Sequence, residues 1–161
     1  MQIRQGNEED WPFIYGLAKE AIPYSISPWR RQSMVQTLHY RDKILRGFWR
    51  WIEQTDSKVF IAEERTESGK NKLAGYLILY PGSKEELTGV TQGWIMDVAV
   101  DAEWRSRGIG RALLAAAEQF CRDHKILYLG LAVTSHNVQA LQLYERFGFA
   151  EERRLMVKVL D

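Results

Sequence analysis

Residues 105–110 read Arg-Ser-Arg-Gly-Ile-Gly, between an apolar run, Ile95–Val100, and a long amphipathic stretch. This order predicts a β-strand, a glycine-containing turn and an α-helix that packs on the sheet. Glycines let the backbone approach a ligand closely, and unpaired N–H groups at a helix start attract an anion. Arg105, Arg107 and Arg111 add positive charge beside them. We therefore predict that the turn binds a phosphorylated ligand.

The glycine spacing disagrees with two common nucleotide-binding patterns. No Gly-Lys-Ser/Thr follows the turn, as a Walker P-loop requires, and no third glycine follows Gly110 closely, as a dinucleotide fingerprint requires. Taken alone, Gly-x-Gly also fits a tight turn that only starts a helix. The rest of the chain has to decide between an anion site and a simple turn.

Composition predicts a single cytoplasmic domain. The 161 residues suffice for one hydrophobic core, so we expect one domain over residues 1–161. A net charge of +1 does not indicate a nucleic-acid partner, and no apolar stretch predicts a signal sequence or a membrane span. The lone Cys121 lies on the apolar face of the helix after the turn, where burial is expected.

Hydrophobic periodicity predicts the remaining elements. The expected strands are Met1–Arg4, Val59–Ala62, Leu73–Tyr80, Trp94–Val100, Leu127–Val133 and Leu155–Leu160. The expected helices run from about Asn7 to Pro23, in two pieces within Arg30–Gln54, from Gly108 to Lys125, and from Asn137 to Gly148. The second and third strands are expected to form an antiparallel hairpin through the polar turn between them. The nearly continuous apolar run Leu127–Val133 predicts a central strand that is buried on both faces.

Three segments from Trp94 onward follow one another in a set order: Asp97-Val98-Ala99-Val100, Arg105-x-x-Gly108-x-Gly110, and Asn137 followed by Leu143-Tyr144-Glu145-Arg146-Phe147-Gly148-Phe149. Together they resemble the GNAT superfamily of acetyl-CoA-dependent N-acetyltransferases. The resemblance implies an α/β (α+β) GNAT fold, a central mixed β-sheet of about six or seven strands flanked by about four helices. Two parallel strands, here Ile95–Val100 and Leu127–Val133, would splay apart and hold the acyl-pantetheine arm of acetyl-CoA.

The resemblance also implies which residues bind this co-substrate. Backbone groups of Val98 and Val100 would pair with the pantetheine arm, although their apolar side chains equally suit an ordinary core strand. Asn137 would cap its helix and hydrogen-bond the arm, or cap the helix alone. The pyrophosphate would lie in the turn formed by Arg105, Ser106, Arg107, Gly108, Ile109, Gly110 and Arg111. No metal is expected, because the histidines show no metal-ligand spacing.

Tyr144 and Asp97 are the candidate catalytic residues. By resemblance, Tyr144 is the general acid for the departing CoA thiolate, since a phenol with an ordinary pKa of about 10 stays protonated at neutral pH. The alternative for Tyr144 is an aromatic packing residue. Asp97 is the candidate general base, because a carboxylate in an apolar strand is costly unless used, and burial raises its pKa. Alternatively, Asp97 orders the strand or binds the substrate ammonium group.

The sequence leaves the amine acceptor open. By resemblance its site lies within Ile22–Trp51, where arginines could attract an acidic acceptor and Trp29, Tyr40, Trp49 and Trp51 could wall a pocket. The alternative is a helix pair with a solvated basic face and a buried aromatic face. We therefore predict direct acetyl transfer from acetyl-CoA to a primary amine of a small molecule, peptide or protein.

Two further expectations concern the class and assembly of the protein. The alternative to an enzyme is a non-catalytic acyl-CoA-binding sensor or interaction module, which retention of both Tyr144 and Asn137 disfavours. An exposed strand edge near the C-terminus could pair with a second copy, which makes a homodimer possible.

Overall fold

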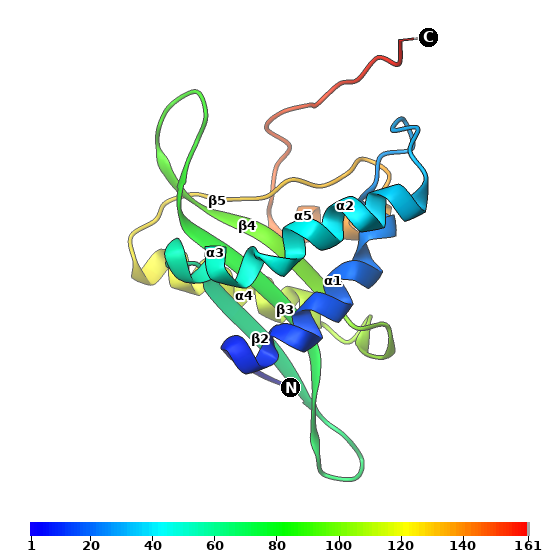
Figure 1. Cartoon of the computed structure of the whole chain (residues 1–161). Helices are drawn as coiled ribbons and strands as arrows, with labels where there is room; N and C mark the ends of the chain where they lie inside the picture. Colours follow the sequence, from blue (N-terminus) through cyan, green and yellow to red (C-terminus); the bar gives the residue numbers. More distant parts are fainter. Residues whose placement is uncertain (161) are drawn as a thin grey trace.

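The computed structural model describes residues 1–160. Its centre is a five-stranded mixed sheet in which the strands lie in chain order, with helices on both faces (Figure 1). Strands one to four are antiparallel neighbours, and the fifth runs parallel to the fourth. The strands are β1 (Gln2–Gln5), β2 (Lys58–Arg65), β3 (Asn71–Lys84), β4 (Thr91–Val100) and β5 (Leu129–Gly130).

Helices cover both faces of this sheet. Three lie on one face and two on the other (Figure 1). The first group is α1 (Trp11–Ser25), α2 (Met34–Arg46) and α3 (Phe48–Gln54), and the second is α4 (Ile109–Asp123) and α5 (Val138–Phe147). Short 3₁₀ turns, Glu8–Asp10 and Ala102–Trp104, precede α1 and the turn before α4. The two expected helical pieces before Gln54 are confirmed as α2 and α3.

β3 is the centre of both core layers. Tyr76 and Ile78 face α1 to α3, whereas Leu77 and Leu79 face α4, and all four side chains are buried. This period-two alternation without polar positions is that of a strand covered on both faces. The expected hairpin between β2 and β3 is confirmed, and Cys121 is buried as expected.

Both predicted ends of α5 are confirmed, but the predicted C-terminal end of α1 is wrong. The side chain of Asn137 accepts a hydrogen bond from the N–H of Ala140 at 3.3 Å, and Gly148 takes the left-handed conformation after the helix. Pro23, by contrast, lies inside α1, which continues to Ser25. A proline in the last turn removes only one helical hydrogen bond, so it does not have to end the helix there.

The run Leu127–Val133 is not the buried central strand that its composition predicts. Only Leu129 and Gly130 form a strand, β5 is an edge strand of the sheet, and Leu127 is 84% exposed. Gly130 lies against the indole of Trp94, where an added Cβ atom would come within 2.9 Å of the ring. After this contact β4 and β5 no longer pair. The sheet therefore has five strands in place of six or seven.

The C-terminal residues Leu155–Leu160 do not form the predicted strand. They have no regular structure, and the side chain of Leu155 is 96% exposed. The preceding Arg153 pairs with Glu85 and Glu86 at the tip of the β3–β4 hairpin, which directs the segment away from the sheet (Figure 1). The strand edge on which the homodimer expectation rested is thus absent. Among residues 1–160, no helix combines the length and apolar character required to cross a membrane.

Candidate active site

The site begins where β4 and β5 separate. The two strands pair only through Gly93 with Leu129 and Trp94 with Gly130. From there to Val100, β4 keeps its partner β3 on one edge, and no strand within residues 1–160 pairs with its other edge. The predicted splay of two parallel strands is therefore present, although β5 is short.

Backbone polar groups of β4 point into this gap. Successive residues of a strand direct their N–H and C=O groups to alternate edges. The N–H of Asp101 donates to the carbonyl oxygen of Ala74 in β3 at 2.9 Å. By this alternation, the backbone groups of Val100 and Val98 point to the opposite edge of β4. These are the two residues that the resemblance assigned to the pantetheine arm, and their backbone directions suit that prediction.

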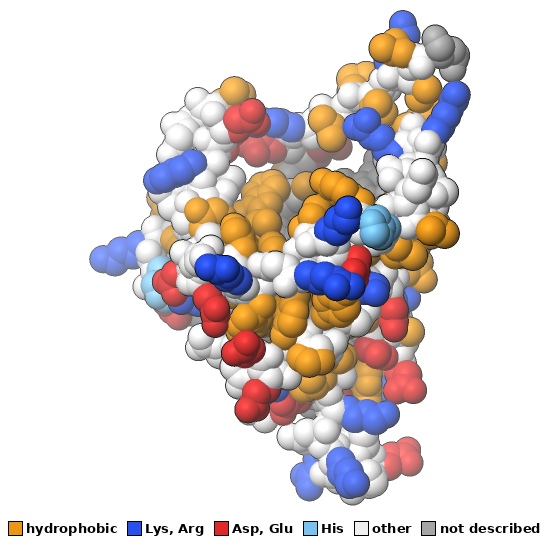
Figure 2. All heavy atoms as spheres, viewed as in Figure 1, with side chains coloured by type: hydrophobic (Ala, Val, Ile, Leu, Met, Phe, Trp, Pro, Cys, Tyr) orange, Lys and Arg blue, Asp and Glu red, His pale blue; other side chains and the backbone are white. Residues whose placement is uncertain are grey.

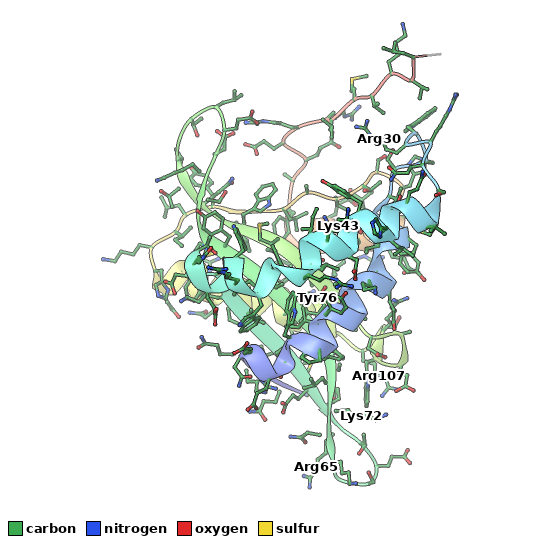
Figure 3. The ribbon with its side chains drawn as sticks, in the orientation of Figure 1. Arg30, Lys43, Arg65, Lys72, Tyr76 and Arg107 are labelled. Atoms are coloured by element: carbon green, nitrogen blue, oxygen red, sulfur yellow. The ribbon has the colours of Figure 1, made fainter. Side chains whose placement is uncertain are left out.

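A β-bulge in β4 sets the direction of Asp97. Ile78 is paired with Asp97 and Leu79 with Ile95, which leaves Met96 as the additional residue. Such a bulge redirects the neighbouring side chains. The carboxylate of Asp97 accepts a hydrogen bond from the hydroxyl of Tyr76, with 2.7 Å between the two oxygens. Figure 3 shows Tyr76 between the sheet and the layer of α1 and α2.

Burial decides the protonation of this pair. Burial raises the pKa of Asp97, whereas the hydrogen bonds from Tyr76 and from the N–H of Val98 lower it. The effect of burial is larger, so the pKa of Asp97 lies above its ordinary value. Burial, followed by the charge of Asp97, raises the pKa of Tyr76 well above its ordinary value. Tyr76 therefore stays a hydrogen-bond donor, and Asp97 is a stronger base than an exposed aspartate. Tyr76 was not among the predicted site residues, because its only sequence signal is a hydroxyl within an otherwise apolar strand.

Tyr144 lies in the same electrostatic environment. Burial, followed by the charge of Asp97, raises the pKa of the Tyr144 phenol to about 12. Its ring packs edge-on against Phe149, with 5.8 Å between the ring centroids. Its hydroxyl makes no hydrogen bond within residues 1–160, so the proton is available to a substrate. The structure thus brings together both candidate catalytic residues from elements that are 47 positions apart in the sequence.

The turn before α4 has the backbone conformation expected of an anion site. Ser106 and Gly108 adopt positive φ angles of 61° and 81°. The first intrahelical bond runs from the N–H of Ala112 to the carbonyl of Gly108, and no side chain caps the helix. The N–H groups of Ile109, Gly110 and Arg111 therefore have no intrahelical acceptor and remain available to an anion.

The arginines of the turn lie next to the gap. Nε of Arg105 donates to the carbonyl oxygen of Val100 at 3.2 Å, and its guanidinium lies 5.4 Å from the ring centroid of Tyr24. The guanidinium of Arg107 lies over the ring of Trp104, 4.9 Å from its centroid, and Figure 3 shows Arg107 at the turn. A carbonyl oxygen has two lone pairs, so Val100 keeps one for a ligand. Trp104 itself packs against the core layer that contains α4.

Substitution of Gly108 tests this turn. An alanine at φ 81° is strained by about 1–2 kcal/mol, although its Cβ would meet no atom within 4 Å. We expect Gly108→Ala to raise the Kd for acetyl-CoA about tenfold, as measured by calorimetric titration. Gly89→Ala is the matched control, because Gly89 also has a positive φ and open space but lies in the β3–β4 hairpin. Equal Kd values for the two variants would contradict the prediction.

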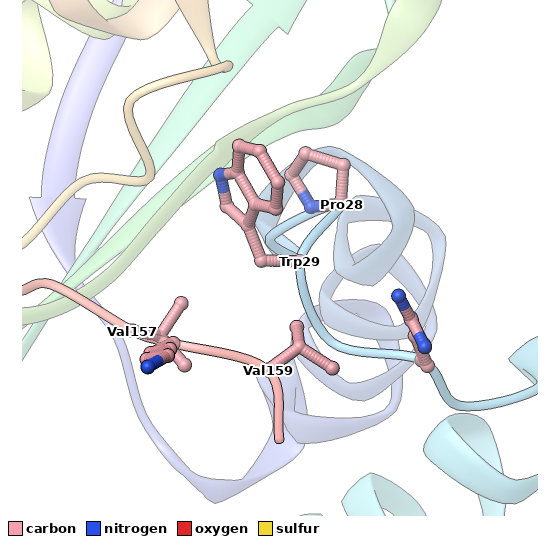
Figure 4. Close-up of a pocket in the computed structure, with 6 residues that line it drawn as sticks. Pro28, Trp29, Val157 and Val159 are labelled. Atoms are coloured by element: carbon pink, nitrogen blue, oxygen red, sulfur yellow. The ribbon is translucent and has the colours of Figure 1, made fainter. Parts of the chain in front are cut away.

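An open cavity adjoins the segment Ile22–Trp51, where the resemblance implied the acceptor site. It has a volume of about 550 Å³ and lies between the α1–α2 loop and the C-terminal segment (Figure 4). Its lining consists of Pro28, Trp29, Arg31, Val157, Lys158 and Val159. Of the expected pocket aromatics, Trp29 lines this cavity, whereas Trp51 stacks on Phe48 with 5.1 Å between ring centroids. The aromatic residues of α3 thus mainly pack the core, as the alternative reading proposed.

Asn137 uses its side-chain oxygen as a helix cap, and its predicted bond to the pantetheine arm stays a prediction. Within residues 1–160, no group of three or more His, Cys, Asp or Glu side chains could hold a metal ion.

Known proteins share both the sequence pattern and the fold. A model of the "Acetyltransferase (GNAT) family" matches residues 14–149. Streptothricin acetyltransferase from Streptomyces lavendulae is 34% identical over 99 residues, which are 61% of this chain and 47% of that protein. A putative acetyl transferase from Pyrococcus furiosus superposes with a TM-score of 0.76 at 27% identity, covering 99% of both chains.

Aminoglycoside N-acetyltransferase AAC(6')-Iy in complex with CoA superposes with a TM-score of 0.68 at 17% identity, covering 99% of both chains, and supports the fold alone. The match to the streptothricin enzyme spans about half of that enzyme's length.

Proposed function

The chain belongs to the GNAT acetyltransferase family, and from this membership we propose that it transfers an acetyl group from acetyl-CoA to a primary amine by direct attack. One observation carries the proposal: the charge of Asp97 on β4 acts on the phenol of Tyr144, which packs against the same core layer as Val98 and Val100. A base for the amine and an acid for the thiolate are the two groups that this reaction needs. No covalent enzyme intermediate is required.

The co-substrate would lie with its pantetheine arm in the gap between β4 and β5. The carbonyl oxygen of Val98 and the backbone groups of Val100 would replace the missing strand, and the Nδ2 group of Asn137 could donate to the arm. The pyrophosphate would accept hydrogen bonds from the free N–H groups at the start of α4. The side chains of Arg105, Arg107 and Arg111 would supply the countercharge.

The proton transfers follow from the two pKa shifts. Asp97 takes a proton from the ammonium group, and the amine nitrogen then attacks the carbonyl carbon of the thioester. When the C–S bond breaks, Tyr144 donates its proton to the sulfur. The resulting phenolate takes the second proton from the nitrogen as the amide forms, and Asp97 releases its proton to solvent. Because burial raises the pKa of Tyr144 to about 12, the phenol is protonated at neutral pH and holds a proton for the departing thiolate.

An acceptor screen tests the proposal. Purified protein is incubated with acetyl-CoA and a panel of amines that contains amino acids, polyamines, amino sugars and peptides, and the released CoA thiol is measured. We expect saturable release with at least one class. Tight acetyl-CoA binding without acceptor-dependent release across the whole panel would overturn the proposal and support a binding module.

A further inference from the structure

Arg41 occupies an inward-facing position of α2. The apolar stripe of α2 and α3 runs through Leu38, Leu45 and Ile52, all of which pack into the layer around Tyr76. Arg41 lies three residues after Leu38 and four before Leu45, on the same helical face. Its side chain is only partly exposed. A cation thus stands where the periodicity expects an apolar residue.

The charge of Arg41 has no counterion within residues 1–160. No carboxylate oxygen lies within 4.0 Å of it, and it donates no hydrogen bond. The neighbouring Asp42 is already engaged by Tyr15, Lys19 and Arg46. A partly buried, unpaired cation is costly, so this inward position favours an anionic partner that residues 1–160 do not supply.

The groups that Arg41 faces are those of the candidate active site. Its charge lowers the pKa of Asp97 and that of Tyr76, the two hydrogen-bonded side chains on the same face of the sheet. Arg41 and Asp97 are nevertheless not in contact as an ion pair. A positive group on α2 and a negative group at the bulge of β4 therefore lie on the same face of the sheet, close enough to interact electrostatically but not as an ion pair.

We propose that Arg41 binds the carboxylate of the acceptor, so that the amine substrate is an amino acid. The inference rests on the proposed function. The ammonium end of such a zwitterion would lie at Asp97, which takes its proton, and the carboxylate would receive two parallel N–H bonds from the guanidinium. Exposed Lys and Arg side chains of α2 add a positive field that attracts such an acceptor and disfavours a polyamine (Figure 2).

Matched acceptor pairs test this proposal. Each standard amino acid is compared with its carboxamide, which keeps the amine and removes the negative charge. We expect wild type to show kcat/KM at least about tenfold higher for the acid of its best pair, the amount that a hydrogen-bonded charge contributes. In Arg41→Gln, KM for the acid should rise about 10- to 100-fold, while kcat and the constants for the carboxamide change little.

Two further variants separate binding from structure. Arg41→Lys keeps the positive charge but lacks the planar guanidinium that donates two parallel N–H bonds. This variant should recover part of the preference for the acid. Arg50→Gln on α3 removes an exposed positive charge and should leave the preference intact. Thermal unfolding and acetyl-CoA titration show that each variant is folded.

Three results would overturn the inference. The first is turnover of amines without preference for a carboxylate, and the second is an equal loss in Arg41→Gln for acids and carboxamides, which would indicate that Arg41 only adjusts Asp97. The third is an equal effect of the Arg41 and Arg50 variants. In each case thiol release still occurs, so the proposed acetyltransferase activity would stand while the acceptor assignment fails.

Discussion

Replacement of Tyr144 by phenylalanine is expected to lower kcat by about 10²- to 10⁴-fold, the range by which general acids accelerate such reactions. The variant loses one oxygen atom and keeps the ring that packs on Phe149. Because the hydroxyl makes no hydrogen bond within residues 1–160, its removal leaves no unpaired partner behind. The stability of the fold and the Kd for acetyl-CoA should therefore stay close to those of wild type.

Steady-state thiol release measures this effect with the best acceptor of the screen. Tyr128→Phe is the matched control, since Tyr128 lies beside β5 and is 59% exposed, and it should keep full activity. The pKa of Tyr144, about 12, predicts that activity does not fall on the alkaline side until well above neutral pH. A Tyr144→Phe variant with wild-type kcat would exclude the phenol as the acid.

Replacement of Asp97 by asparagine is expected to lower kcat/KM by about 10²-fold or more at neutral pH. The amide keeps an oxygen that can accept the bond from Tyr76, but it cannot take a proton from the amine. In wild type, activity should rise with pH through the raised pKa of Asp97, because only the ionised carboxylate is a base. The variant should lose this acidic limb of the pH profile.

The Tm of Asp97→Asn shows whether the variant has lost activity because the base is missing or because the protein is unfolded. Folding raises the pKa of Asp97 above 3.8, so the folded state binds this proton more tightly than the unfolded chain. The resulting stabilisation is complete below the ordinary pKa and is lost as the pH rises through the raised one. At neutral pH the ionised carboxylate therefore destabilises the fold, and Asp97→Asn should have an unchanged or higher Tm.

Asp101→Asn is the control for the charge change. Asp101 follows β4 and its side chain accepts a bond from the N–H of Glu103, a cap that asparagine can also form. This variant should keep wild-type activity and its acidic limb. If both variants lose activity alike, the loss reflects the local negative field and not a base at position 97.

The accuracy of the sequence predictions depended on how local each structure is. The turn at Gly108, the cap at Asn137 and the hairpin of β2 and β3 are each set by residues within one short segment, and all were predicted correctly. The run Leu127–Val133 and the segment Leu155–Leu160 had strand-like composition and were predicted wrongly. An apolar run forms a strand only where another strand offers an unpaired edge. Here the contact of Gly130 with Trp94 ends the first run, and the ion pair of Arg153 with Glu85 directs the second away from the sheet.

The sequence by itself determined the family, the position of the glycine turn before α4 and the two residues at which catalysis is expected, because motif spacing and backbone preferences are local properties. Only the tertiary structure decided that Tyr76 donates to Asp97, that Tyr144 lies within the field of that carboxylate, and that Arg41 faces inward without a counterion. These groups lie on β3, β4, α5 and α2. Their pKa values and partners depend on burial and distance across the fold, which no single segment specifies.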